Sequence, residues 1–264
     1  MSNKQYTIGV FGGGVVGQAV ASFFNGAKVY DKFKPQDSLV DVLNQELIFV
    51  CVPTPFKDGK FDKSILEEVF VEIGKDKKER VVVIKSTSIP GTTEYFQEKY
   101  PHLKVLFNPE FLSEKTSNED FVKPDKQIIG FTEKSKDIAQ SVLDILPDAP
   151  YKKIMKASSA ELVKYAVNTY YATKVTFGNM LYDLAQSLGA DYEEVKQAFV
   201  SDQRITDSHF GVMHGGYRGY GGKCLPKDLQ ALAALGNQSN VDVSLLETVD
   251  LLNTKYKNQS QDKS

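Results

Sequence analysis

The chain has 264 residues, which is enough for one large domain or two smaller domains with hydrophobic cores. Its 32 Lys and Arg residues nearly balance 34 Asp and Glu residues, and the net charge is only −2. This balance argues against a strongly basic nucleic-acid-binding surface, although a local basic pocket for a phosphate is still compatible with it.

The two cysteines, Cys51 and Cys224, match neither a disulfide framework nor a metal site, so we expect a reduced, cytoplasmic protein without a bound metal. No apolar run approaches the roughly 18 residues that would cross a membrane. Residues 1–5 do not begin a signal-peptide pattern. The sequence therefore predicts no membrane partner and no nucleic-acid partner.

Short apolar runs alternate with helical patterns in the first half of the chain. The apolar runs predict strands at residues 6–11, 28–30, 47–52, 81–85, 104–107 and 127–130. The patterns between them predict helices at residues 15–24, 37–43, 63–74, 92–99 and 134–146. Several runs are apolar on both faces, which is typical of a parallel sheet covered by helices. Residues 1–150 are therefore predicted to form a doubly wound, Rossmann-type α/β domain.

The second half of the chain predicts an all-helical domain over residues 151–264, with no strand after about residue 150. Ser158 and Glu161 have the spacing of a capping box, and the helical pattern runs from there to Leu188, before Gly189. A helix of about 30 residues is about 45 Å long, so we expect it to join domains or subunits. Further helices are expected at residues 191–200, 225–235 and 243–256, followed by a disordered tail.

A glycine-rich turn follows the first predicted strand and opens the first predicted helix. Gly12 permits the tight turn, Gly14 lets a pyrophosphate approach the backbone, and Gly17 allows close helix packing. Asp31, at the end of the next strand, would bind a ribose and disfavour a 2′-phosphate, so the turn predicts NAD rather than NADP. A glycine turn without a ligand is the alternative. The predicted cofactor residues here are Gly12, Gly14, Val15, Val16, Gly17, Asp31 and Lys32.

Two later turns follow predicted parallel strands, whose carboxyl ends collect ligands. Residues 52–55 read Val-Pro-Thr-Pro, and residues 86–92 begin Ser-Thr-Ser. Their threonines, Thr54 and Thr87, are placed to reach a cofactor or a substrate, although ordinary turn chemistry explains them equally well. We add Val52, Pro53, Thr54 and Thr87 to the predicted cofactor site.

The segment at residues 219–228 carries the strongest chemical signal. A glycine-rich loop runs into a helix at Cys224, and Pro226 suits the first turn of that helix. The helix dipole, Lys223 and Lys227 are expected to lower the pKa of the Cys224 thiol below its reference of about 8.5, which favours a reactive thiolate. Cys51 lies in an apolar strand and is expected to be inert.

Two carboxylates, Glu110 and Glu114, would share one helical face if Pro109 started a turn, and one of them could activate water. In the long helix, Lys164 and Asn168 share a face with Glu161. The lysine could stabilise a developing alkoxide, and the asparagine could orient a hydroxyl group or a water molecule. A solvated charge and a surface polar residue are the alternatives for these two side chains.

These motifs, in this order, resemble the UDP-glucose/GDP-mannose dehydrogenase family over nearly the whole chain. The matching segments are the glycine turn at 12–17 and residues 52–55, 85–87, 108–114, 161–168 and 221–228. The last segment, Gly-Gly-Lys-Cys-Leu-Pro-Lys-Asp, is the most specific.

The resemblance implies a four-electron, NAD-dependent oxidation of a nucleotide-sugar C6 alcohol to the acid, as in polysaccharide biosynthesis, with UDP-glucose favoured as substrate. It implies that Cys224 forms a thiohemiacetal and then a thioester. The catalytic residues that it implies are Thr87, Glu110, Lys164, Asn168, Cys224 and Asp228, with Glu114 in support on the cofactor side. The implied substrate contacts are Glu110, Phe111, Leu112, Lys164, Asn168, Arg204, Tyr220, Gly221 and Cys224.

The chain also departs from the family pattern. It ends where a third, nucleotide-binding domain is usual, and residues 31–47 form a shorter stretch than in the family. Ser113 and Lys126 stand where arginines are common, and the loop from Arg204 to Cys224 is longer. These departures concern substrate affinity and specificity rather than the predicted catalytic residues.

The long helix carries more apolar surface than two short helices can cover, which predicts an interface. We expect a homodimer paired through this helix, as the resemblance also implies, with Arg204 reaching the partner's substrate. The sequence leaves two other functions as alternatives. A β-hydroxyacid dehydrogenase would share the nucleotide fold and the Lys-x-x-x-Asn helix but needs no thiol, so Cys224 argues against it. A non-catalytic NAD-binding or assembly module would not need the predicted catalytic residues.

Overall fold

The computed structural model describes residues 6–34, 36–112 and 116–261. The chain divides into two compact units, of which the first comprises Met1–Lys57 and Phe61–Lys164 and the second comprises residues 58–60 and Tyr165–Ser264. The division falls inside the long helix α7 (Ala157–Leu188). Each unit has a hydrophobic core of its own.

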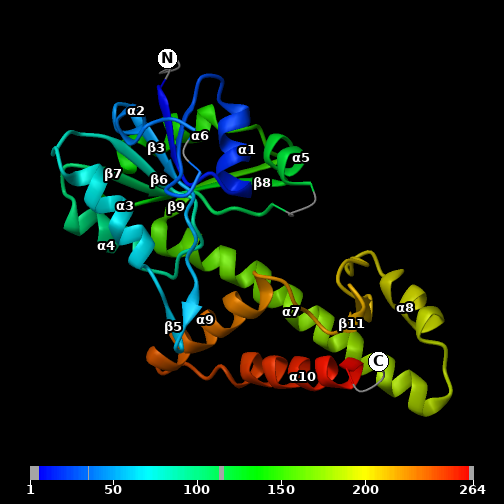
Figure 1. Cartoon of the computed structure of the whole chain (residues 1–264). Helices are drawn as coiled ribbons and strands as arrows, with labels where there is room; N and C mark the ends of the chain where they lie inside the picture. Colours follow the sequence, from blue (N-terminus) through cyan, green and yellow to red (C-terminus); the bar gives the residue numbers. More distant parts are fainter. Residues whose placement is uncertain (1–5, 35, 113–115, 262–264) are drawn as a thin grey trace. The chain divides into compact units, whose positions relative to one another are not determined.

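A seven-stranded sheet forms the centre of the first unit (Figure 1). Its order is β2-β1-β3-β6-β7-β8-β9, and only the β7–β8 pair is antiparallel. The strands are β1 (Ile8–Phe11), β2 (Lys28–Tyr30), β3 (Leu47–Val50), β6 (Val81–Ile84), β7 (Lys104–Phe107), β8 (Lys126–Phe131) and β9 (Tyr151–Lys156). The predicted Rossmann-type α/β fold is confirmed.

Helices cover both faces of this sheet. They are α1 (Val15–Phe23), α2 (Leu39–Leu43), α3 (Ser64–Gly74), α4 (Thr92–Lys99), α5 (Ser117–Val122) and α6 (Ala139–Ile145), with a 3₁₀ turn, η1 (Lys136–Ile138). Successive strand residues alternate between two apolar clusters: Phe49 and Val83 pack with α1 and α6, whereas Ile48 and Val82 pack with α3 and α4. The continuous apolar runs of the sequence arise because both faces of each central strand are buried.

Strand β9 overturns the expectation that strands stop near residue 150, and two short strands at residues 213–214 and 217–218 of the second unit do so as well. Strand β9 lies at the edge of the sheet beside β8, and its exposed residues are mostly lysines, so the apolar signature of a central strand is missing. Helix α5 was not expected either. A short hairpin, β4 (Phe56–Lys57) and β5 (Lys60–Phe61), was also absent from the predicted elements.

The second unit is built on the remainder of α7, with α8 (Tyr192–Val200), α9 (Leu225–Gln238), α10 (Ser244–Gln261) and a two-residue hairpin of β10 (Met213–His214) and β11 (Tyr217–Arg218) (Figure 1). Gly189, with φ +69°, follows the end of α7 as predicted. The expected disordered tail is wrong for residues 257–261, where α10 continues. Two contacts from the hairpin hold its last turns: Arg218 donates to Gln259, and Lys257 lies over the Tyr217 ring. None of the described helices is long and apolar enough to cross a membrane.

The predicted capping box of Ser158 and Glu161 does not form. The Glu161 carboxylate instead accepts hydrogen bonds from Gly91 N (2.7 Å) and Thr93 N (2.8 Å) at the start of α4. In return, Ser158 N donates to Glu94, which lies in the first turn of α4. Each helix therefore caps the other. Burial raises the pKa of Glu161 to about 8, against the lowering effect of its hydrogen bonds.

Candidate active site

The glycine turn of the first unit has the geometry that a dinucleotide needs. Gly12 has φ +97°, and a Cβ there would lie 2.4 Å from Cys51 O; a Cβ on Gly17 would lie 1.8 Å from Gly12 O. Gly14 is the N-cap of α1, where no side chain caps the helix and a Cβ would meet no described atom within 4 Å. The amides at the start of α1 are therefore accessible to an anion such as a pyrophosphate.

Asp31 lies immediately after β2, where it faces the glycine turn. Its carboxylate accepts hydrogen bonds from Gly13 N (2.8 Å), Phe33 N (2.9 Å) and Lys34 N (3.1 Å). These bonds, with that from Gly13 the strongest, hold the pKa of Asp31 below its usual value, so the group is ionised at neutral pH. Lys32 is paired with Glu68 at 3.0 Å, which partly offsets its charge beside this carboxylate.

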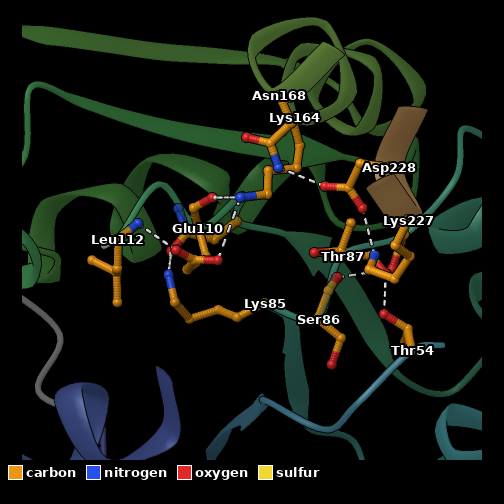
Figure 2. Close-up of polar contacts among 12 residues, drawn as sticks. Thr54, Lys85, Ser86, Thr87, Glu110, Leu112, Lys164, Asn168, Lys227 and Asp228 are labelled. Atoms are coloured by element: carbon orange, nitrogen blue, oxygen red, sulfur yellow. Dashed lines mark hydrogen bonds and ion pairs between the residues drawn. The ribbon is translucent and has the colours of Figure 1, made fainter. Parts of the chain in front are cut away.

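The two turns after β3 and β6 are fastened to each other. The Ser86 hydroxyl accepts from Val52 N (2.9 Å) and donates to Val52 O (2.7 Å), while the Thr54 hydroxyl donates to Thr87 O (2.7 Å). The Thr54 hydroxyl therefore stabilises the turns, which is the role that ordinary turn chemistry predicts for it. Thr87 is held by its backbone next to these residues (Figure 2).

Lys164 and Glu110 form a largely buried charged pair in the first unit (Figure 2). Lys164 Nζ donates to Glu110 O (2.5 Å) and lies 3.4 Å from Glu110 Oε2. Lys164 is 5% exposed, so the alternative of a solvated charge is wrong. The Phe111 ring is also a neighbour of this lysine, with ring centroid to Nζ distances of 5.6 Å for Lys164 and 4.3 Å for Lys126.

The helical turn expected from Pro109 does not form through Leu112, because this stretch is an irregular loop. Leu112 N donates to Glu110 Oε1, which orients the carboxylate from within the loop (Figure 2). Ser113 and Glu114, which was predicted to support the cofactor, lie outside the described residues. The predicted pairing of Glu110 and Glu114 on one helical face is therefore not supported by residues 108–112, the part of this loop that the structure describes.

Lys85 is a buried cation that begins the motif at residues 85–87 but was not among the predicted site residues. It is 5% exposed, and its Nζ donates to Asn108 Oδ1 (2.6 Å), while Asn108 Nδ2 donates to Ile128 O (2.8 Å). Burial lowers the pKa of Lys85 to about 8. The signal that could have found it was a lysine at the end of an otherwise apolar strand. Burial also raises the pKa of the Cys51 thiol to about 12, in agreement with its expected inertness.

The second unit carries the predicted nucleophile. Cys224 is exposed and is the N-cap of α9, with Pro226 in the first turn, as the sequence predicted. One turn later, the buried Asp228 accepts a hydrogen bond from Asn168 Nδ2 (2.6 Å) and pairs with Lys227 Nζ (2.5 Å) (Figure 2). Asn168 is 8% exposed, so the alternative of a surface polar residue is wrong.

Two residues that were predicted to contact the substrate, Tyr220 and Arg204, have side chains that contact other parts of the second unit. The Tyr220 ring is buried in the core of the second unit and its hydroxyl donates to Asp250 (3.3 Å), so the side chain has a structural role. The Arg204 side chain is 87% exposed and pairs with Asp202, which leaves it accessible at the surface. Among the residues that the structure describes, no group of three or more His, Cys, Asp or Glu side chains could hold a metal ion.

Comparison with known proteins gives matches over both units. Residues 31–146 match the NAD binding domain of the UDP-glucose/GDP-mannose dehydrogenase family, and residues 158–255 match the central domain of the same family. The prediction of NAD as the cofactor is thus confirmed at the level of the domain.

Individual relatives agree with these matches. A UDP-glucose 6-dehydrogenase of Pseudomonas aeruginosa is 33% identical over 226 residues, 80% of this chain and 49% of the relative. A GDP-mannose 6-dehydrogenase of Pseudomonas syringae pv. tomato is 35% identical over 225 residues, 79% of this chain and 50% of the relative. The structure of a UDP-glucose dehydrogenase from Pyrobaculum islandicum has a TM-score of 0.84 and 29% identity, covering 96% of this chain and 69% of the other.

The chain spans about half the length of the curated relatives that it matches. The segments that hold Lys164, Asn168 and Cys224 fall within the central-domain match. The chain belongs to the UDP-glucose/GDP-mannose dehydrogenase family.

Proposed function

We propose that the chain catalyses the NAD-dependent oxidation of the C6 alcohol of a nucleotide sugar to the carboxylate, with Cys224 as the nucleophile. The observation that carries the proposal is the setting of Cys224. Its thiol is exposed at the N-terminus of α9, one turn before the buried Asn168–Asp228 pair. A thiol at a helix N-terminus is stabilised as a thiolate by the helix dipole.

The first unit fits the cofactor that this reaction requires. Gly12 and Gly17 allow the close backbone approach, and the uncapped start of α1 suits a pyrophosphate. Asp31 is ionised and suits the hydroxyl groups of a ribose. When bound, NAD supplies the oxidant for each of the two steps by accepting a hydride from the substrate carbon.

We assign the chemistry of the chain as follows. The Cys224 thiolate adds to the aldehyde carbon to form a thiohemiacetal, which the second oxidation converts into a thioester. Water then attacks the thioester carbonyl, the C–S bond breaks, and the thiolate of Cys224 is regenerated with the carboxylate as product. The covalent intermediate keeps the reactive aldehyde bound between the two oxidations.

The remaining groups would serve proton transfer and charge stabilisation. Lys164, a buried cation with its Nζ on Glu110, is suited to stabilise the alkoxide and oxyanion. Glu110, with Thr87, would orient the hydrolytic water and take its proton. Asn168 and Asp228 would position the substrate oxygen and receive protons in the second unit. The roles of Phe111, Leu112, Gly221 and Glu114 as substrate or cofactor contacts stay predictions.

We propose UDP-glucose as the substrate and a homodimer as the working state. Relatives with both UDP-glucose and GDP-mannose names match the chain, so the choice rests on the motifs at residues 108–114 and 224–228. The dimer is supported by large apolar side chains of α7 that lie along one stripe and are exposed, Tyr170, Phe177, Leu184 and Leu188. The exposed Arg204 would reach the partner's substrate, and the pair would work in the cytoplasm.

The decisive experiment is turnover by the pure protein with NAD and a panel of nucleotide sugars, followed by NADH absorbance and product mass. Cys224→Ser should abolish steady NADH production, and intact-mass spectrometry should find a slowly hydrolysed ester adduct. Near wild-type formation of the acid by Cys224→Ser would sink the mechanism. Cys51→Ser is the matched control. Cys51 is partly buried against the core of the first unit and its thiol has a raised pKa, so this variant should keep turnover within twofold of wild type.

A further inference from the structure

The amide of Asn253, in helix α10, makes an unusual pair of contacts with the loop that leads to Cys224. Its Oδ1 accepts a hydrogen bond from Tyr220 N (2.7 Å), and its Nδ2 donates to Tyr220 O (3.0 Å). Both backbone groups of a single loop residue are therefore bonded by one side chain. Asn253 is buried, so water does not compete for these bonds.

The glycines of the loop accommodate this approach. Gly219 has φ +82°, and a Cβ on it would lie 2.4 Å from Asn253 Oδ1. Two residues later, a Cβ on Gly221 would lie 2.1 Å from the Tyr217 hydroxyl oxygen. Gly219 requires glycine because its backbone is left-handed and the buried Asn253 amide occupies the space of a Cβ, whereas at Gly221 the Tyr217 hydroxyl end could move aside. The loop is thus fixed by tertiary contacts, in addition to any sugar that it binds.

Tyr220 connects this arrangement to the core of the second unit. Its ring packs with Ala172 and Val175 of α7, Leu229 of α9 and Val249 of α10. Cys224 follows four residues after Tyr220, at the N-cap of α9. A displacement of the Tyr220 backbone would therefore move the chain that enters α9 and carries the thiol.

We propose that Asn253 is a positioning residue, which fixes the loop at residues 219–223 and thereby holds the Cys224 thiol at the N-terminus of α9. The proposal rests on the proposed role of Cys224 as nucleophile. A carboxamide suits this task because it offers one donor and one acceptor, like the edge of a peptide. An aspartate of the same shape would set a carboxylate oxygen against Tyr220 O, and an alanine would leave both backbone groups unpaired.

The test compares the full chain with Asn253→Asp and Val249→Ala. The control lies one turn earlier on α10 and loses packing around Tyr220 but no hydrogen bond to the loop. The readout is the rate at which iodoacetamide alkylates Cys224, followed by intact mass at pH 7.5, well below the melting temperature of each variant. Cys51 serves as an internal unreactive thiol.

Asn253→Asp should lower the alkylation rate at least fivefold, because Cys224 would no longer be held at the positive end of the α9 helix dipole. It should also lower kcat for UDP-glucose at least tenfold, with the KM for NAD unchanged. Val249→Ala should lower the melting temperature while its alkylation rate stays within twofold of wild type. An alkylation rate in Asn253→Asp that is unchanged or faster would overturn the proposal.

Gly219→Ala displaces the same amide from the loop side and should give the same loss of alkylation, so the outcome does not depend on the folding of one variant. The alkylation readout is also independent of thioester formation. If Cys224→Ser keeps its turnover while Asn253→Asp slows alkylation, the proposed function fails and the positioning role stands. If Cys224→Ser is inactive and both loop variants alkylate normally, only the positioning role fails.

Discussion

The two units hold their functional side chains by different means. In the first unit, Thr54, Thr87 and Glu110 follow the ends of β3, β6 and β7, whose registers are fixed by backbone pairing across the sheet. In the second unit, Cys224 follows an irregular loop, and the neighbouring backbone is held by side chains such as Asn253. A sheet distributes positional control over many backbone bonds. A loop between helices depends on a few side chains, so single substitutions there should have larger effects.

The largest effect is expected for Arg218 in the second unit. Its guanidinium bonds to Asn179 and Asp183 of α7 and to Gln259 of α10, and lies between two tyrosine rings. Arg218→Ala should lower the free energy of unfolding by about 3 kcal/mol, because it removes several bonds to a charged, largely buried group. Urea unfolding measures this loss.

Arg204→Ala is the matched control, since that arginine is exposed and should cost less than about 0.5 kcal/mol. Arg218→Lys keeps the charge but not the planar fork, and it should recover less than half of the loss. If Arg218→Ala lowered the free energy of unfolding as little as Arg204→Ala, the second unit would not depend on single side chains in the way proposed.

Glu161 is an exception within the first unit, because here a single side chain holds two helices together: it joins the start of α7 to the start of α4. Its folded pKa of about 8 lies above the ordinary value of 4.5, so the folded state binds the proton more tightly. Its contribution to stability is therefore full below about pH 4.5 and is lost as the pH rises to about 8, with a slope of at most about 1.4 kcal/mol per pH unit. Urea unfolding between pH 5 and 8.5 should show this fall.

Glu161→Gln removes the titrating group, so its stability should depend less on pH over the same range. Glu68→Gln is the control, because Glu68 is exposed and its loss should leave the slope as in wild type. An identical slope in wild type and Glu161→Gln would show that this carboxyl group does not titrate there.

Asp31, which follows the end of β2 and faces the glycine turn, tests the predicted position of the cofactor ribose. Wild type should prefer NAD to NADP, because a 2′-phosphate would face an ionised carboxylate. Asp31→Asn should reduce the ratio of kcat/KM for NAD to kcat/KM for NADP by about tenfold, which corresponds to about 1.4 kcal/mol. Lys32→Ala should change the ratio less than twofold, since Lys32 is exposed and paired with Glu68. Equal efficiency of wild type with both cofactors would contradict the assignment.

The smallest effect is expected for Thr54→Val, which removes only the hydrogen bond to Thr87 O. Because the sheet holds both turns, the free energy of unfolding should fall by about 1 kcal/mol and the KM for NAD should rise less than threefold. Thr173→Val, on the partly buried hydroxyl of α7 that bonds within its own helix, is the control for the loss of a hydroxyl. A tenfold rise in KM would mean that these turns depend on side chains after all.

The sequence predicted the elements whose burial is uniform and failed where tertiary contacts decide. The central strands are apolar on both faces, so their existence could be read directly; β9 could not, because an exposed edge strand rich in lysine has no apolar period. Gly189 and Cys224 were placed correctly at helix ends by local rules. Glu161 was misassigned, because its partner amides come from 70 and 68 residues away.

The same limit applies to the candidate site. For Lys164 and Asn168 the sequence left open that both side chains lie at the surface, because helical spacing does not show what covers a helix face. Both side chains are buried in the structure. The burial of the Tyr220 ring was not foreseen, because a tyrosine in a glycine-rich loop offers no local sign of a core residue. Asn253 carries no local signal in the sequence, since an asparagine within a helix is ordinary until its contacts are known.

The reciprocal caps of α4 and α7 have a consequence for the order of folding. The amides at the start of α4 are satisfied by Glu161, which is synthesised 68 residues after Thr93. A helix of eight residues is marginal on its own in water, so α4 cannot be stable on the nascent chain before the first turn of α7 has left the ribosome. Docking of these two helices is thus a non-local event, and the part of the sheet face that α4 covers beside α3 stays exposed until then.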